Sequence, residues 1–249
     1  MTVINTYNET SLHKTLKQIY ALEFNGQTEQ KTGSYIYDII TKDSQIIEIQ
    51  TSNISSLKNK IEFLLKQNKK ITVVHPLAEQ RIIKTCDSEH STVTTRKSPK
   101  KQTIYSVLRS LTGIYSFLTE ENFTLEIIFT NQTEYRQKTE EKVQSKNKAR
   151  RHLRAWITTD KSLDSINSKI RLKTKEDYKK LLPETLPQQF TPPQLYKSIL
   201  ELKDFEHFTD SQKKSAAQNY SLVIWLLGKM KIIKKTGSKQ GRSWIYQIL

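Results

Sequence analysis

The sequence is poor in cysteine and glycine and has no long apolar run. A single cysteine, Cys86, excludes an intramolecular disulfide framework and a zinc site built from cysteines. Only six glycines are present, and without a glycine-rich phosphate loop a nucleotide-hydrolysing motor is not expected. No run reaches about 18 apolar residues, and the first residues lack the apolar core of a signal peptide. We therefore expect a soluble, cytoplasmic protein without a membrane partner.

The chain is strongly basic. It carries 41 Lys and Arg against 25 Asp and Glu, a formal net charge of +16, and its pI is near 9.7. Such a surplus indicates a polyanionic partner, either nucleic acid or an anionic membrane surface. The hydrophobic share of 35% is low, but 3 Trp, 11 Tyr and 8 Phe still allow a real core.

Composition divides the chain into three parts. Residues 1–130 mix helical and strand patterns, residues 131–189 indicate a basic helical or linker extension, and residues 190–249 are helical and end in a hairpin. The first part favours an α/β (α+β) fold with a central mixed sheet flanked by helices. Its predicted elements are a helix over 9–21, strands over 28–36, 37–41 and 45–51, a helix from 55 or 56, a strand over 70–76, a helix over 104–118 and a strand over 123–130.

Two acidic residues lie in a predicted β-hairpin centred on Asp43. Antiparallel pairing about that residue places Asp38 opposite Glu48, with their Cβ atoms about 4.5–5.5 Å apart. Gln50 follows on the same face, because side chains alternate along a strand. Two carboxylates this close repel each other, and a Mg²⁺ or Mn²⁺ ion bound between them would remove the repulsion. The alternative is an ordinary amphipathic hairpin with its polar face in water.

This pattern resembles the PD-(D/E)xK, or restriction-endonuclease-like, nuclease superfamily. The resemblance rests on a helix, then Asp38, a nine-residue gap, the segment Glu48-Ile49-Gln50, a second helix and an apolar strand, and it covers about residues 8–130. It implies a restriction-endonuclease-like fold in which Asp38 and Glu48 bind Mg²⁺ (or Mn²⁺) and catalyse.

The resemblance also implies supporting residues. An acidic residue of the first helix often joins such sites, and Glu9 stands at that place. Gln50 occupies the position of the superfamily's usual lysine, where it would orient the attacking water or the phosphate. A lysine of the following helix, Lys58 or Lys60, would then supply the positive charge.

The implied activity is that of a Mg²⁺-dependent DNA endonuclease of the restriction or defence type, which hydrolyses phosphodiester bonds and often forms a homodimer. The alternative is a catalytically inactive DNA-binding or protein-interaction protein that retains the nuclease scaffold. RNA stays open as the nucleic acid, because basic residues bind the phosphates of either polymer.

Two basic segments are candidates for contact with a phosphate backbone. One is the loop 96–101, and the other is the run 142–154, which contains no acidic residue. The alternative for both is a solvated basic face. The candidate residues are Lys100, Lys101, Arg150, Arg151 and Arg154.

The C-terminal part, residues 190–249, resembles a winged helix. Thr191 is predicted to cap a helix that begins with two prolines, and a long helix over 211–230 precedes strands over 231–235 and 243–248. The resemblance implies DNA contacts from the second helix and the hairpin, although winged helices also bind proteins. The implied contacts are Gln212, Lys213, Lys214, Ser215, Gln218, Asn219, Lys239 and Arg242.

The histidines indicate no site of their own. They are scattered and show no metal-ligand spacing, and we expect His75, at the end of an apolar strand, to be structural. The five are His13, His75, His90, His152 and His207.

Overall fold

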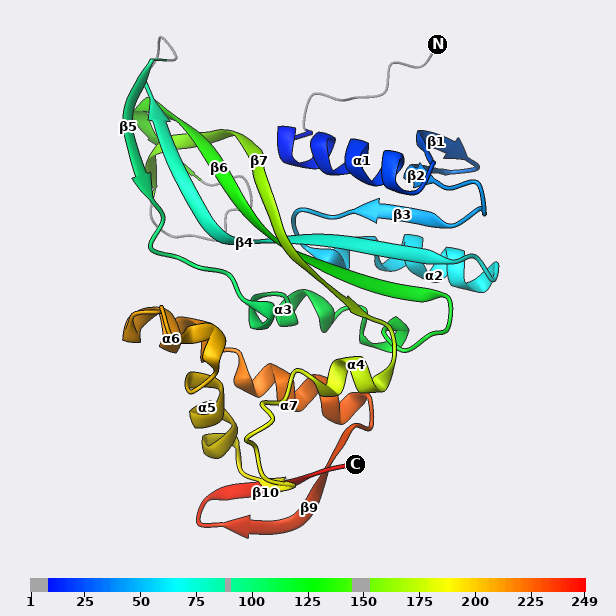
Figure 1. The fold of residues 1–249 in the computed structure, drawn as a ribbon, viewed down its shortest axis with the longest axis vertical. Coiled ribbons are helices and arrows are strands. Elements are labelled where there is room, and N and C mark those ends of the chain that lie inside the picture. The colour runs from blue at the N-terminus through cyan, green and yellow to red at the C-terminus, as the bar shows by residue number, and fades with distance from the viewer. Residues whose placement is uncertain (1–8, 88–90, 145–152) are drawn as a thin grey trace.

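The computed structural model describes residues 9–87, 91–144 and 153–249 (Figure 1). The fold is mixed α/β, as predicted, and its centre is a seven-stranded sheet flanked by helices. The strand order is β1–β2–β3–β4–β6–β7, with β5 paired to β4. Within the described residues, no helix is both long enough and apolar enough to cross a membrane.

The elements of the first part follow the predicted order. β1, β2 and β3 form an antiparallel meander, and α2 leads to β4, which runs parallel to β3. Their bounds are α1 (Ser11–Glu23), β1 (Gln27–Thr32), β2 (Tyr35–Ile40), β3 (Ile46–Ile49), α2 (Lys58–Lys66), β4 (Ile71–Cys86) and β5 (Thr92–Lys97), with a 3₁₀ turn over Ile54–Leu57.

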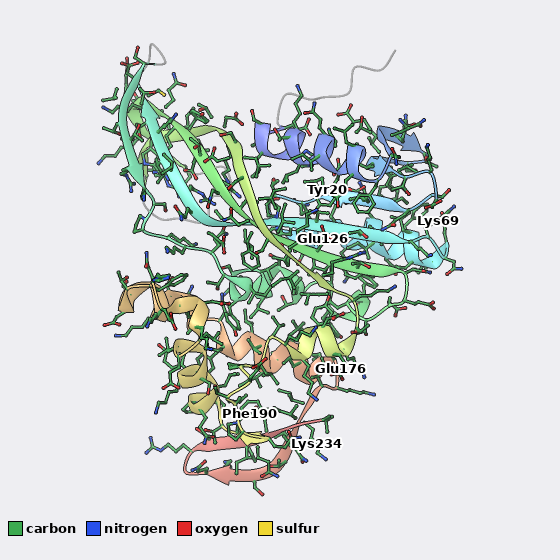
Figure 2. All side chains as sticks on the ribbon, in the orientation of Figure 1. Tyr20, Lys69, Glu126, Glu176, Phe190 and Lys234 are labelled. Carbon is green, nitrogen blue, oxygen red and sulfur yellow. The ribbon has the colours of Figure 1, made fainter. Side chains whose placement is uncertain are left out.

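Helix α1 covers one face of the sheet. The side chains of Leu12, Leu16 and Tyr20 recur at helical spacing and are buried against the sheet. Figure 2 shows Tyr20 directed at Glu126 of β6, and the Tyr20 hydroxyl donates a hydrogen bond to that buried carboxylate. This contact satisfies a charge that would otherwise be costly to bury.

The hairpin of β2 and β3 has the predicted register. Ile39 pairs with Ile47 and Ile40 pairs with Ile46, which is pairing about Asp43. Along β3 the isoleucines pack on both sides: Ile47 lies in the apolar cluster beneath α1, and Ile46 lies in the larger cluster on the other face. The strand is therefore buried throughout, and a charged residue within it needs a partner.

The predicted helix over 104–118 is wrong in its length. The segment forms a 3₁₀ turn over Ile104–Ser106, the short α3 (Leu108–Leu111) and a second 3₁₀ turn over Tyr115–Phe117. Gly113 lies in the break, packed closely against Ser55: a Cβ added to Gly113 would lie 2.4 Å from the Ser55 Oγ. The close approach of Ser55 explains a glycine here, and glycine disfavours a continuous helix.

Residues 131–189 are not a helical extension. β6 (Phe123–Val143) and β7 (Arg154–Leu172) pair antiparallel over most of their length, and α4 (Lys175–Lys179) is the only helix among the described residues of this part. Threonine and isoleucine alternate with the charged residues of these strands, and β-branched side chains favour extended backbone. We call residues 79–87, 91–97, 131–143 and 154–166 the ribbon; in Figure 1 it extends from the sheet away from α2.

The C-terminal part packs under the large sheet. Thr191 begins α5 with a capping box to Gln194, as the sequence predicts, but the predicted long helix breaks into two. A second sheet has the order β8–β10–β9, and one apolar cluster continues from the large sheet into this part. The elements are β8 (Gln189–Phe190), α5 (Pro192–Leu200), α6 (Asp210–Ala217), α7 (Tyr220–Lys229), β9 (Ile233–Gln240) and β10 (Ser243–Ile248).

Candidate active site

The two predicted carboxylates lie where the pairing of β2 with β3 ends. The last pair there is Ile39 with Ile47, and Asp38 and Glu48 follow directly on it. Asp38 Oδ2 accepts a hydrogen bond from the Ile49 N–H at 2.8 Å. The predicted opposite pair Asp38–Glu48 is not part of this ladder: Asp38 is contacted by His13 of α1 and Glu48 by Lys60 of α2. The two carboxylates are still close enough for the charge of Asp38 to raise the pKa of Glu48.

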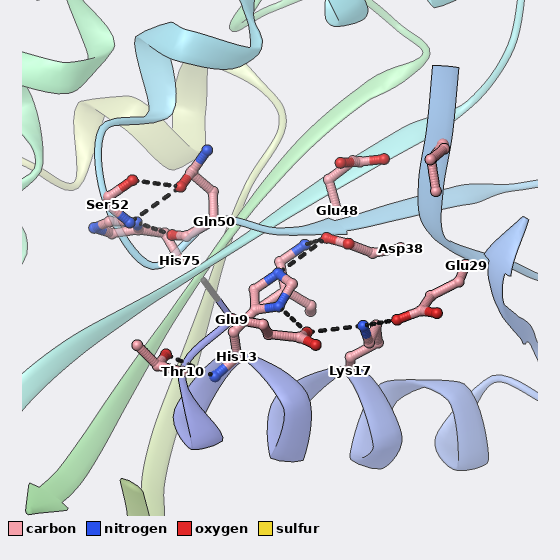
Figure 3. Close-up of polar contacts among 12 residues, drawn as sticks. Glu9, Thr10, His13, Lys17, Glu29, Asp38, Glu48, Gln50, Ser52 and His75 are labelled. Carbon is pink, nitrogen blue, oxygen red and sulfur yellow. Dashed lines mark hydrogen bonds and ion pairs between the residues drawn. The ribbon is translucent and has the colours of Figure 1, made fainter. Parts of the chain in front are cut away.

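Asp38 is held from α1 by a histidine. His13 Nε2 lies 3.3 Å from Asp38 Oδ2, and its Nδ1 is hydrogen-bonded to Glu9 Oε1 (Figure 3). Lys17 Nζ continues the chain, at 2.8 Å from Glu9 and 2.7 Å from Glu29. The structure therefore connects the predicted Glu9 to Asp38 through His13, which sequence reasoning missed. The spacing of four residues between His13 and Lys17, with Glu9 just before the helix, was the available signal, because residues four apart share a helix face.

The neighbouring charges determine the protonation states of His13 and Asp38. Burial disfavours the charged imidazole of His13, but the hydrogen bonds and charges of Asp38 and Glu9 outweigh it and raise the pKa to about 9. Burial likewise opposes the charged form of Asp38, yet His13, the Ile49 N–H and Lys60 hold its pKa below the usual value. At neutral pH an imidazolium thus bridges two carboxylates.

Glu48 is the least satisfied group of the site. Its side chain is 4% exposed, and Lys60 Nζ lies 2.8 Å from Oε2 while also donating to the Ile36 carbonyl at 2.8 Å. Burial, reinforced by the charge of Asp38, raises the pKa of Glu48 to about 7, although Lys60 offsets part of the shift. Oε1 is buried and has no hydrogen-bond partner within the described residues. Such an atom calls for a ligand, because buried polar groups are normally paired.

The donor set fits a hard divalent cation. The described residues contain no group of three or more His, Cys, Asp or Glu side chains arranged to hold a metal. Mg²⁺ does not require one, since it keeps several waters and binds through one or two carboxylates. Asp38 and Glu48 would supply those two carboxylates, and the unpartnered Oε1 of Glu48 would be a ligand atom.

Two other predicted site residues are not part of this arrangement. Lys58 is exposed at the start of α2, and Lys60 contacts Glu48 instead, because residues two apart on a helix point about 200° apart. The Gln50 side-chain amide accepts hydrogen bonds from Ser52 and donates one to Ser56 at 3.0 Å. The Gln50 side chain thus stabilises the loop after β3, and its hydrogen bonds do not involve Asp38 or Glu48.

The predicted nucleic-acid contacts fall into three groups. Those exposed to solvent are Lys100, Lys214, Gln218, Lys239 and Arg242. Lys101 and Lys213 are half-buried, as is Arg154, whose guanidinium lies 4.6 Å from the centre of the Trp156 ring. Arg150 and Arg151 lie outside the described residues.

Two amides of the predicted recognition helix face the protein. Asn219 donates to the Tyr105 carbonyl at 3.0 Å, and Gln212 donates to the Pro99 carbonyl at 2.8 Å. Both amides are therefore engaged by the protein rather than directed outward as the implied DNA contacts require. The break between α6 and α7 accounts for Asn219, since it turns that residue toward Tyr105.

Comparison with known sequences assigns a family. The chain belongs to the family described as "Domain of unknown function (DUF8091)", which matches residues 10–173, the part that holds the site and the ribbon. It is also 31% identical over 126 residues to an "Uncharacterized protein" of Treponema pallidum (strain Nichols), covering 51% of this chain and 49% of that protein. The chain thus spans about half the length of this relative. No solved structure matches the chain.

Proposed function

We propose that this DUF8091 protein is a Mg²⁺-dependent DNA endonuclease of the restriction or defence type, which hydrolyses phosphodiester bonds. One observation carries the proposal: a buried, unpartnered carboxylate oxygen of Glu48 beside the carboxylate of Asp38. The order of elements supports it. A helix, three antiparallel strands, a second helix and a strand parallel to the third agree with the resemblance to the PD-(D/E)xK superfamily.

In this function Asp38 and Glu48 would hold Mg²⁺ or Mn²⁺. The cation, when bound, lowers the pKa of a coordinated water and neutralises charge on the phosphate. His13 keeps the Asp38 carboxylate ionised and fixed in orientation. Lys60 places an ammonium group at Glu48, where a positive charge favours the anionic transition state of phosphodiester hydrolysis. Lys60 therefore takes the part that the sequence assigns to Lys58 or Lys60.

We further propose that residues 190–249 bind DNA as a winged-helix module. The three-stranded sheet β8–β10–β9 beside α5, α6 and α7 supports this reading. The β9–β10 hairpin is basic, and Lys235 and Lys239 lie 3.2 and 4.3 Å from the centre of the Trp244 ring. Because Gln212 and Asn219 face the protein, the proposed contacts narrow to Lys213, Lys214, Ser215, Gln218, Lys239 and Arg242.

The decisive experiment is cleavage of a DNA panel with Mg²⁺, Mn²⁺ or EDTA. The panel contains supercoiled plasmid, linear duplex, single strand and a branched junction. We expect metal-dependent cutting by the wild type and none by Asp38→Asn or Glu48→Gln. Glu62→Gln is the matched control, because Glu62 forms a surface pair with Lys66 on α2 and undergoes the same chemical change.

Two results would contradict the nuclease. Undiminished cutting by both site variants would show that Asp38 and Glu48 are not required for cleavage. Tight DNA binding without cleavage of any substrate would support the alternative, an inactive DNA-binding protein that retains the scaffold.

A further inference from the structure

The ribbon carries a cluster of cations on one face. Arg81 and Arg136 both contact the carboxylate of Glu134, at 3.4 and 2.7 Å. Lys161 pairs with Glu134 across β6 and β7, so its side chain is on the same face. The Arg136 guanidinium also lies 3.6 Å from the centre of the Trp156 ring. We call this set the arginine face: Arg81, Glu134, Arg136, Arg154, Trp156 and Lys161.

The arginine face is on the same side of the sheet as α1. Leu163 packs against the apolar cluster beneath α1 and pairs with Gln132, and Glu134 follows two residues later on that side. The first turn of α1 is tied to the ribbon by Ser11, whose N–H donates to Asp160 at 2.8 Å. In Figure 1 this end of α1 lies against β7. The face therefore adjoins the first turn of α1, which carries His13.

Among the described residues, the cations of the arginine face outnumber its acid. Arg81 and Arg136 contact Glu134, Lys161 lies opposite it and Arg154 lies at Trp156, although the side chains of Arg81 and Arg136 are only 21% and 15% exposed. The Arg81 Nε–H is buried and has no hydrogen-bond partner among the described residues. Burial, with the nearby charge of Arg81, lowers the pKa of Lys161, and Glu134 offsets only part of this shift. Partly buried positive charges in excess destabilise the fold unless a bound anion neutralises them.

We propose that the arginine face binds the phosphate backbone of duplex DNA and holds the substrate beside Asp38 and Glu48. This inference rests on the proposed nuclease function and names a substrate contact outside both the catalytic carboxylates and the C-terminal hairpin. Guanidinium groups suit phosphates because their N–H donors form a fork that two phosphate oxygens can accept. Contacts of this kind fix the position of a duplex without reading its sequence.

The test is binding of the full-length chain to a fluorescent DNA duplex in EDTA, measured by anisotropy across a salt series. Each phosphate contact adds a slope of about 0.9 to the dependence of log affinity on log salt, so loss of one contact weakens binding about 8-fold at 0.1 M salt. We expect this loss for Arg136→Gln and for Arg154→Gln. Arg154 has no ion pair in the described structure, so its variant does not break one.

Two matched variants should change the DNA affinity differently from the arginine variants. Glu134→Gln removes the acid and leaves the cations, so we expect tighter binding than in the wild type. Arg109→Gln, a change at an exposed residue of α3, should leave affinity and salt slope unchanged. Thermal unfolding of each variant confirms that it is folded.

The proposal is overturned if folded Arg136→Gln and Arg154→Gln keep the wild-type affinity and slope, or if Glu134→Gln weakens binding. A preference for duplex RNA over the matched DNA would overturn the choice of ligand. Because EDTA prevents metal-dependent cleavage, these outcomes are independent of the cleavage test on Glu48→Gln, and either proposal can fail alone.

Discussion

Replacing Lys60 with methionine tests how the buried Glu48 is compensated. Lys60 and Glu48 have side chains 17% and 4% exposed and are 2.8 Å apart, which makes them a largely buried pair. Removing one partner of such a pair costs about 3–5 kcal/mol, because the remaining charge is buried alone. We therefore expect Lys60→Met to lower the free energy of unfolding by about that amount in EDTA at a pH well above 7, where Glu48 stays charged. At neutral pH the loss is smaller, because Glu48 without Lys60 takes up a proton.

The same pair predicts a partial rescue. In Lys60→Met/Glu48→Gln no uncompensated charge remains, so about 1–3 kcal/mol of the loss should return as coupling energy. Mg²⁺ should also restore stability to Lys60→Met, by about 1.4 kcal/mol at ten times the dissociation constant. It should not do so in the double variant, which lacks the Glu48 carboxylate.

Urea unfolding at fixed pH, followed by circular dichroism, measures these differences directly. A matched Lys66→Met variant, on the exposed part of the same helix, should change stability by less than about 1 kcal/mol. If the two single losses simply add in the double variant, Lys60 does not neutralise Glu48. If Mg²⁺ stabilises all variants equally, Glu48 is not a ligand.

Two further predictions concern packing and pH. Gly113→Ala should lower the free energy of unfolding by about 1–3 kcal/mol, because the added Cβ meets the Ser55 Oγ at 2.4 Å. Gly228 lies in α7, and a Cβ added there has no neighbouring atom within 4 Å. Gly228→Ala should therefore raise the free energy of unfolding by up to about 1 kcal/mol. Equal effects at the two glycines would contradict the close approach. Burial lowers the pKa of His75, so the unfolded state binds the proton more readily, and wild type should lose stability relative to His75→Asn as pH falls below about 6.5. Parallel pH profiles in EDTA would show that His75 is not kept neutral.

The register of the β2–β3 hairpin at the candidate site could be predicted because it depends on residues close together in the sequence. A short turn centred on Asp43 and strict alternation fix which residues face each other, and the observed pairs Ile39–Ile47 and Ile40–Ile46 follow that rule. The contacts around the carboxylates are not local. His13 reaches Asp38 from a helix 25 residues away, and only packing of α1 on the sheet determines that approach.

Elsewhere, tertiary contacts override the local pattern. The apolar and polar spacing over 211–230 is that of one helix, but Asn219 bonds to the Tyr105 carbonyl and the helix divides there. The local sequence pattern also fails to predict the strands of the ribbon. Its strands are rich in charge, and they are stable as strands because β4 and β6 pair in parallel and share cross-strand partners such as Arg81 and Glu134. No single segment contains that information.

The continuity of β4 has a geometric consequence. The same strand passes beside β3 at the candidate site and then, after a bulge between Ala78 and Gln80, enters the ribbon. The site and the arginine face are therefore joined by pleated sheet rather than by a linker, and their separation is set by the number of residues between them, at about 3.3 Å each. In the proposed nuclease, this strand would fix the distance along the DNA between the contacted phosphates and the cleavage position. Lengthening β4, β6 and β7 together by two residues would keep the side chains on the same face and shift the proposed cleavage position, whereas one residue would turn the arginine face to the opposite side.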